Sequence, residues 1–345
     1  MSSTDRPPHH DPRGGFRNPW ANSEAGTPAS VLKWVATRWR DRRPDPKPSA
    51  FARVPPAFAT PRAAPDELRV TWIGHSTVLV QLGAITILTD PVWARRVGPL
   101  GVFGPARWVP PGAALDALPP IDLVLLSHNH YDHFDRAAIR RLARRDTTAW
   151  ATPLGVAASV RALGVAAPIE LDWWQSAEHR TRDGQSLTIA AVPAQHFSGR
   201  GVADRNQSLW CGFVVRTPAH TLYFAGDSGL HPEFGRIAEA HGPFDVVCMP
   251  IGAYEPRWFM RPVHMSADEA IDAYRAIRAV HPHAARPSRF VPMHWGTFKL
   301  TDEPMDEPPR RARAAWDAAG FAADDFWLLR HGETRIAPLP PPTPP

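Results

Sequence analysis

The stretch Ser127-His128-Asn129-His130-Tyr131-Asp132-His133 places three imidazoles and a carboxylate within six residues. It follows directly from the mainly apolar run Ile121–Ser127, which is typical of a buried strand. Side chains this close in sequence cannot all point one way from a helix or a strand, whereas a tight loop can bring them together. Because α/β folds bind ligands at the carboxyl ends of their strands, we expect a metal site at this loop.

Three further residues of metal-ligand type, His196, Asp227 and His294, each come just after a predicted strand. Imidazoles with one or two carboxylates suit zinc. The seven candidate ligands are enough for two ions, so we expect two Zn²⁺ per chain. Two ions roughly 3.5–4 Å apart supply a nucleophile from water and stabilise both oxygens of a displacement. We assign one ion to His128, His130 and His196, the other to Asp132, His133 and His294, and the bridge between them to Asp227.

Asp90 ends another predicted strand and precedes Pro91. A carboxylate in this position can accept a hydrogen bond from a histidine ligand and so orient its ring. A turn formed by the Asp-Pro pair explains the residue equally well, and both interpretations stay open.

The rest of the chain alternates strands and helices. Ser266 and Glu269 form a capping box that begins one helix, and other helices are expected over Asp135–Arg145 and Pro309–Ala319. This mixture indicates a layered α/β sandwich. We expect one domain over 28–336, between flexible or extended proline-rich tails at 1–27 and 337–345. The predicted strands are Leu68–Ile73, Thr77–Leu82, Ala84–Thr89, Ile121–Ser127, Ser186–Val192, Leu209–Thr217, Thr221–Ala225, Asp245–Pro250 and Arg289–Met293.

Composition excludes several classes of protein. Lys and Arg number 39 against 34 Asp and Glu, and this net charge of +5, without a Lys-rich stretch, argues against a nucleic-acid partner. Two cysteines exclude a disulfide framework. No apolar run approaches the ~20 residues of a membrane span, and the N-terminus lacks the apolar region of a signal peptide. We therefore expect a cytoplasmic protein.

The pattern His-x-His-x-Asp-His with a later His, Asp and His resembles the metallo-β-lactamase superfamily of hydrolases. The chain is also similar to one branch, the N-acylphosphatidylethanolamine-hydrolysing phospholipase D family. That resemblance implies an αββα sandwich and a two-zinc phosphodiesterase that releases N-acylethanolamine and phosphatidate. The similar stretches are Asn18–Trp20, Thr71–His75, Leu88–Pro91, Ser127–His133, Leu171–Trp174, Phe224–Asp227, Pro250–Met260, His294–Phe298 and His331–Glu333.

Three residues are candidates for contact with the substrate. His264, which the resemblance places by the active site, would bind the phosphate or protonate the leaving alkoxide, for which a pKa near neutrality suits it. Tyr254 and Arg257 would line a pocket, with Arg257 suited to phosphate, although packing of their loop is an equal alternative. With His264, Asp132 is the second residue expected to act in catalysis. His75, directly after the predicted strand Leu68–Ile73, is a further candidate near the metals, but we favour a tight turn at residues 74–76 for it.

Other functions remain open at this stage. Attack on carbon needs nothing different from the metals, so a zinc lactonase or thioesterase that acts on a small ester is the alternative. The resemblance outside the metal loops favours attack on phosphorus. Other phosphodiesters than the phospholipid stay open as substrates. The sequence leaves the oligomeric state undecided, a homodimer included.

Pro28–Arg40 predicts a helix that begins at the N-cap Thr27. Its apolar residues fall on one face, which is typical both of a packed helix and of a basic helix that docks on a membrane. We favour packing. Docking, the alternative, would bring the protein to the inner membrane surface through Lys33, Trp34, Arg38, Trp39 and Arg40.

Overall fold

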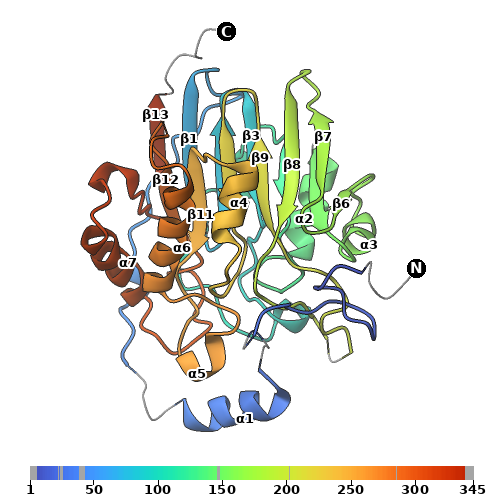
Figure 1. Ribbon diagram of the computed structural model, residues 1–345, viewed down its shortest axis with the longest axis vertical. Coiled ribbons are helices and arrows are strands. Elements are labelled where there is room, and N and C mark those ends of the chain that lie inside the picture. The colour runs from blue at the N-terminus through green and yellow to red at the C-terminus, as the bar shows by residue number, and fades with distance from the viewer. Residues whose placement is uncertain are drawn as a thin grey trace.

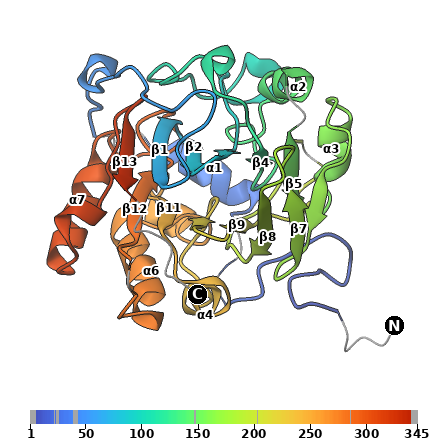
Figure 2. The ribbon, with the colours of Figure 1, turned by 90° about the horizontal axis from the view of Figure 1, so that it is seen from above.

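The computed structural model describes residues 6–21, 23, 26–38, 43–145, 148–201, 203–284 and 286–338. Two β-sheets pack face to face and helices cover their outer faces (Figures 1 and 2). Val70 and Trp72 of the first sheet share one buried core with Ile189 and Phe213 of the second. This αββα arrangement confirms the predicted fold.

The first sheet has seven strands in the order β13-β1-β2-β3-β4-β5-β6. β13 and β1 to β3 are antiparallel, whereas β3 to β6 run parallel. Helices α2 (Arg136–Arg145) and α3 (Ala157–Arg161) lie outside it, where Ile139 and Leu142 pack with Leu79 and Leu88. The strands are β1 (Glu67–Gly74), β2 (Thr77–Leu82), β3 (Ile85–Thr89), β4 (Leu123–Leu125), β5 (Ala149–Pro153), β6 (Ile169–Leu171) and β13 (Thr334–Pro338).

The second sheet has six strands in the order β12-β11-β10-β9-β8-β7. β10 to β12 run parallel, and β7 to β10 are antiparallel. Its outer helices are α4 (Phe234–His241), α6 (Ala267–Val280) and α7 (Glu307–Ala318), which enclose a second apolar cluster. The strands are β7 (Ser176–Arg180), β8 (Ser186–Val192), β9 (Gly212–Arg216), β10 (Thr221–Phe224), β11 (Val246–Pro250) and β12 (Arg289–Met293).

Shorter elements complete the described chain. α1 (Pro28–Thr37) and α5 (Arg257–Met260) lie together at one end of the sandwich, at the bottom of Figure 1. The predicted capping box of α6 is present: Ser266 accepts from the Glu269 amide, and Glu269 accepts from the Ser266 amide. The single-turn 3₁₀ helices are Pro48–Ala50, Pro99–Gly101, Leu115–Ala117 and Ala323–Asp325.

The expected flexible N-terminal tail is wrong for residues 6–21, which pack against the domain. His9 is 4% exposed and its ring stacks on Trp173 at 4.3 Å between centroids. Trp20 stacks on the same indole at 5.6 Å. Burial of these aromatic side chains therefore orders the segment, although its proline-rich composition is typical of a flexible tail. At the other end β13 includes residues 337 and 338, and the rest of the predicted C-terminal tail, 339–345, lies outside the described residues.

Ile189 and Ile336 provide a matched test of this packing, because Ile189 is fully buried between the sheets and Ile336 is 47% exposed on β13. We expect Ile189→Ala to lower the free energy of unfolding by about 2–5 kcal/mol, since it leaves a cavity. Ile336→Ala should change it by only about 0.5 kcal/mol. Urea denaturation followed by circular dichroism measures both, and equal losses would contradict the assigned core.

Candidate metal centre

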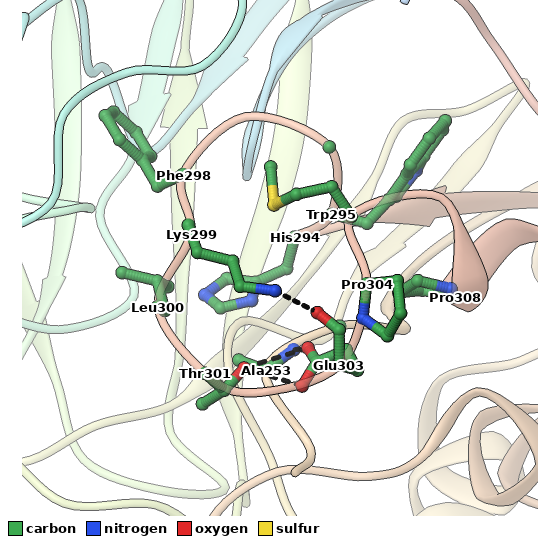
Figure 3. A pocket seen from close by; sticks show the side chains of 13 residues that line it. Ala253, His294, Trp295, Phe298, Lys299, Leu300, Thr301, Glu303, Pro304 and Pro308 are labelled. Atoms are coloured by element: carbon green, nitrogen blue, oxygen red, sulfur yellow. Dashed lines mark hydrogen bonds between the residues drawn. The ribbon is translucent and has the colours of Figure 1, made fainter. Parts of the chain in front are cut away.

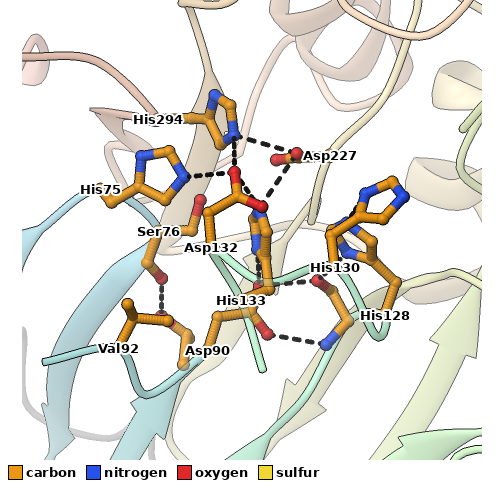
Figure 4. A network of polar contacts seen from close by, with 12 residues as sticks. His75, Ser76, Asp90, Val92, His128, His130, Asp132, His133, Asp227 and His294 are labelled. Carbon is orange, nitrogen blue, oxygen red and sulfur yellow. Dashed lines mark hydrogen bonds and ion pairs between the residues drawn. The ribbon is translucent and has the colours of Figure 1, made fainter. Parts of the chain in front are cut away.

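The predicted metal ligands converge at one end of the two sheets (Figure 4). Each comes from a segment that follows a strand: residues 128–133 after β4, His196 after β8, Asp227 after β10 and His294 after β12. The carboxyl ends of parallel strands meet at the same edge of a sheet, which explains why residues so distant in sequence lie together. The structure brings all seven predicted ligands into this site.

The first group contains His128, His130 and His196. Nδ1 of His130 lies 2.8 Å from Nε2 of His128 and 3.1 Å from Nε2 of His196. His128 and His196 are buried, and His130 is partly buried. Three ring nitrogens therefore point at one small volume, as the sequence predicted.

Hydrogen-bond partners assign the tautomers of two of these rings. The Ser127 hydroxyl donates to Asp90 at 2.6 Å, so Nδ1 of His128, 2.9 Å from the same hydroxyl, must donate to it. Nδ1 of His196 lies 2.9 Å from the Val263 carbonyl oxygen and must also donate. In both neutral rings the proton is then on Nδ1 and Nε2 carries a free lone pair. This is the tautomer that binds a metal ion through Nε2.

The second group contains Asp132, His133 and His294, with Asp227 between the two groups. One oxygen of Asp227, Oδ2, lies 3.0 Å from Nε2 of both His133 and His294, and 3.8 Å from Nε2 of His196. The other oxygen is buried without a hydrogen-bond partner among the described residues. Asp227 therefore has the position expected of a bridging ligand.

The two carboxylates of this group require positive charge nearby. Burial alone would raise the pKa of Asp227, but His133 and His294 hold it well below its usual range. Burial likewise opposes protonation of His294, yet Asp227 and Asp132 raise its pKa to about 9. A divalent cation satisfies the same demand while leaving the imidazoles neutral, and its binding would release protons. The donor set thus fits metal ions.

Asp90 occupies the orienting position that the sequence predicted. Its side chain is fully buried and accepts from the Ser127 amide at 2.7 Å and from Nδ1 of His133 at 2.6 Å. This second bond places the lone pair of neutral His133 on Nε2, toward Asp227 and Asp132. Burial raises the pKa of Asp90, although His133 and Ser127 oppose the shift.

His264 lies in the centre, as predicted, with Nε2 4.0 Å from Asp227 and its ring 4.9 Å from that of His196. Its expected near-neutral pKa is wrong. Burial lowers the pKa of His264 well below the usual value despite the attraction of Asp227, so the ring is neutral. Nδ1 is buried and has no partner among the described residues.

Comparison with known proteins agrees with this geometry. Residues 86–295 match the family described as β-lactamase superfamily domain. The chain belongs to the β-lactamase superfamily. N-acyl-phosphatidylethanolamine-hydrolyzing phospholipase D 1 of Caenorhabditis elegans is 39% identical over 259 residues, which cover 73% of this chain and 70% of that protein. The protein is thus a metal-dependent hydrolase.

Two solved structures agree on the fold. An isothiocyanate hydrolase from Delia radicum gut bacteria superposes with a TM-score of 0.57 at 22% identity, covering 77% of this chain and 98% of the other. A metallo hydrolase from Ignicoccus hospitalis gives 0.54 at 24% identity, with 79% and 98% covered. At these identities the likeness concerns the superfamily fold alone.

Two predicted substrate-binding residues have structural partners instead. The ring of Tyr254 is buried in the cluster between the second sheet and its helices, and its hydroxyl donates to Glu307 at 2.8 Å. The Arg257 guanidinium donates to Glu269 at 2.6 Å and to the His264 carbonyl at 3.0 Å. The prediction of substrate contact is therefore wrong for Tyr254. Arg257 positions the backbone of His264.

His75, which the sequence assigned to a turn, is part of the centre. It follows β1 with a positive φ of 57°, and its Nε2 lies 3.0 Å from Oδ2 of Asp132. Burial and the neighbouring His294 lower the pKa of His75 to about 3, so a neutral ring donates to Asp132 and orients it. Its position directly after a strand, which makes it a candidate in the sequence, was the correct signal, and the turn and the contact with Asp132 occur together.

Arg200 and Glu303 each stabilise a loop next to the centre, and neither was predicted. Arg200 donates to the carbonyls of Asn129 at 2.8 Å and Phe134 at 3.0 Å, and so closes the His-rich loop. Glu303, in the loop that follows His294, accepts from the Ala253 and Glu255 amides at 2.7 and 3.0 Å and so ties this loop to the one after β11 (Figure 3).

Asp90→Asn tests the orienting role of this carboxylate. We expect the affinity for metal to fall by about 10–100-fold, because an amide accepts less strongly from Nδ1 of His133. Competition with a chelator measures the affinity. Asp116→Asn, at a side chain that is 73% exposed, is the matched control and should leave it unchanged. Equal affinities for wild type and Asp90→Asn would show that Asp90 does not act through His133.

Proposed function

We propose that the protein is a two-zinc phosphodiesterase of phospholipase D type that cleaves N-acylphosphatidylethanolamine-like lipids to N-acylethanolamine and phosphatidate. The observation that carries this proposal is the convergence of five imidazoles and two carboxylates in two groups that share Asp227. The relative from C. elegans, whose name specifies this lipid, supports the substrate.

Zinc suits a donor set of imidazoles with few carboxylates. His128, His130 and His196 would hold one ion, Asp132, His133 and His294 the other, and Asp227 both. When bound, the pair supplies a nucleophile from water and stabilises the negative charge of the displacement.

The remaining steps fall to side chains of the chain itself. Burial would raise the pKa of Asp132, but without metal His133 and His294 hold it well below its usual range. A bound ion would supply this positive charge in their place, so the carboxylate would stay ionised and could accept a hydrogen bond from the water consumed. His264 presents a neutral ring to the substrate and binds a phosphoryl oxygen as a hydrogen-bond donor. Arg257 and Glu269 fix the backbone that carries it.

The reaction is tested by the products formed in oxygen-18 water. With N-acylphosphatidylethanolamine as substrate, we expect mass spectrometry to find N-acylethanolamine and phosphatidate, with the label on the phosphate. Attack on phosphorus puts the water oxygen there. Label in a released fatty acid would mean cleavage at carbon, as in the lactonase or thioesterase alternative, and would refute the proposed reaction.

We further propose that the enzyme works at a lipid surface, since a diacyl lipid leaves a bilayer at a cost of about 0.8 kcal/mol per CH₂. Among the described residues no helix is long and apolar enough to span a membrane, so contact would be peripheral. On α1, Leu32 is 71% exposed and Val35 54%. Trp258 of α5 is half exposed beside them, with Lys33 Nζ 4.7 Å above its ring.

The structure changes which residues of α1 would meet the lipid. Trp34 faces the protein: it donates to Asp302 at 2.6 Å and stacks on Phe259 at 5.4 Å. Arg38 pairs with Asp302 at 3.4 Å. Trp39 and Arg40 lie outside the described residues. α1 therefore packs on the protein through one face and exposes apolar side chains on the opposite face, so it combines features of both predicted alternatives.

Leu32→Glu combined with Val35→Glu should weaken binding to vesicles of phosphatidylcholine and phosphatidylglycerol by more than about tenfold, because each buried apolar side chain contributes about 1.5–3 kcal/mol. Sedimentation measures binding, and turnover of a short-chain soluble phosphodiester should stay unchanged. Ile336→Glu is the control that should bind like wild type, because this exposed residue belongs to β13, which lies far from α1 in Figure 1. If vesicle binding and turnover of the soluble phosphodiester fell together, α1 would be a purely structural element.

A further inference from the structure

A second cluster of metal-ligand side chains lies outside the catalytic centre. It consists of His9 and His10 in the N-terminal segment and Asp172 directly after β6. Nε2 of His9 lies 2.6 Å from Oδ1 of Asp172, and Nε2 of His10 lies 2.8 Å from Oδ2. All three ligand atoms lie within 4.8 Å of one another. Two imidazoles from adjacent residues thus converge on one carboxylate.

The surroundings fix these side chains in place. The His9 ring is stacked on Trp173, and the His10 ring meets Phe16 edge-on at 5.1 Å. Oδ1 of Asp172 also accepts from the Trp173 amide at 2.8 Å, which orients the carboxylate. His9 and Asp172 are buried, whereas the His10 side chain is 27% exposed, so water can reach the cluster from one side.

We propose that His9, His10 and Asp172 form a separate, structural site for a borderline divalent cation such as Zn²⁺. Two imidazole nitrogens and a carboxylate are ligands that this class of ion prefers, and water from the exposed side would complete the coordination. The alternative is a pair of N–H···O hydrogen bonds, for which the same distances are suitable. The two explanations differ in the amount of zinc that the protein binds, which can be measured.

Such an ion would tie the start of the chain to the catalytic centre. Asn18, in the same segment as His9, donates to the His196 carbonyl at 2.8 Å and accepts from the His196 amide at 3.2 Å. It therefore holds the backbone of a predicted catalytic ligand from both sides. Anchoring residues 9 and 10 on Asp172 keeps this segment in place against the domain.

The full-length protein with His9→Gln and His10→Gln separates the two explanations. Glutamine retains an N–H donor for Asp172 but is a poor zinc ligand, so a hydrogen-bonded anchor survives while a metal site is lost. We expect wild type, equilibrated with zinc and then freed of excess, to hold about one more zinc ion per chain than this variant. His283→Ala, at an exposed histidine, should retain the wild-type content.

The measured quantity is the difference in zinc content between two proteins that share the same seven ligands in the catalytic centre. Equal zinc content would overturn the proposal and identify the cluster as hydrogen-bonded pairs. Trypsin gives a second measurement, because Arg13 is exposed within the anchored segment. Added Zn²⁺ should slow cleavage after Arg13 more in wild type than in the glutamine variant, and an equal response would also contradict the site.

Discussion

One buried carboxylate, that of Asp90, sets the proton positions on both halves of the metal centre. It accepts directly from Nδ1 of His133, which leaves the lone pair of that ring facing Asp227. It also accepts a hydrogen bond from the Ser127 hydroxyl, so Nδ1 of His128 must donate to Ser127, which places the lone pair of His128 on Nε2. One ligand in each group therefore depends on a residue that would touch neither ion.

The fold supplies partners for the polar groups that this arrangement buries. Carboxylates and imidazoles that are almost fully buried need partners of opposite charge or complementary hydrogen bonds. The loops after β4, β10 and β12 provide these partners for one another. Arg200 holds the loop after β4, and Glu303 ties the loop after β12 to the one after β11. The apolar core between the sheets supports the site without contributing to its chemistry.

The metal ligands could be predicted because each follows a strand whose apolar pattern is local. The same patterns predicted a layered α/β sandwich, and the family resemblance implied its αββα layers. β7 could not be predicted, since Ser176–Arg180 is an edge strand with little apolar character. The directions of Tyr254 and Arg257 depend on Glu307 and Glu269, and no pattern near residues 254–257 shows that these glutamates are the partners. The N-terminal segment was mistaken for a tail because its anchor, Asp172, lies 163 residues away from His9.

The contact between Asn18 and His196 has a consequence for biosynthesis. The two residues are 178 positions apart, so Asn18 leaves the ribosome well before the His196 backbone to which it binds. His294 is made later still. Because chains emerge from the N-terminus, the His-rich loop at 128–133 exists for a time without the residues that later enclose it. The two-group site can therefore form only after His294 has been made and has joined the loop.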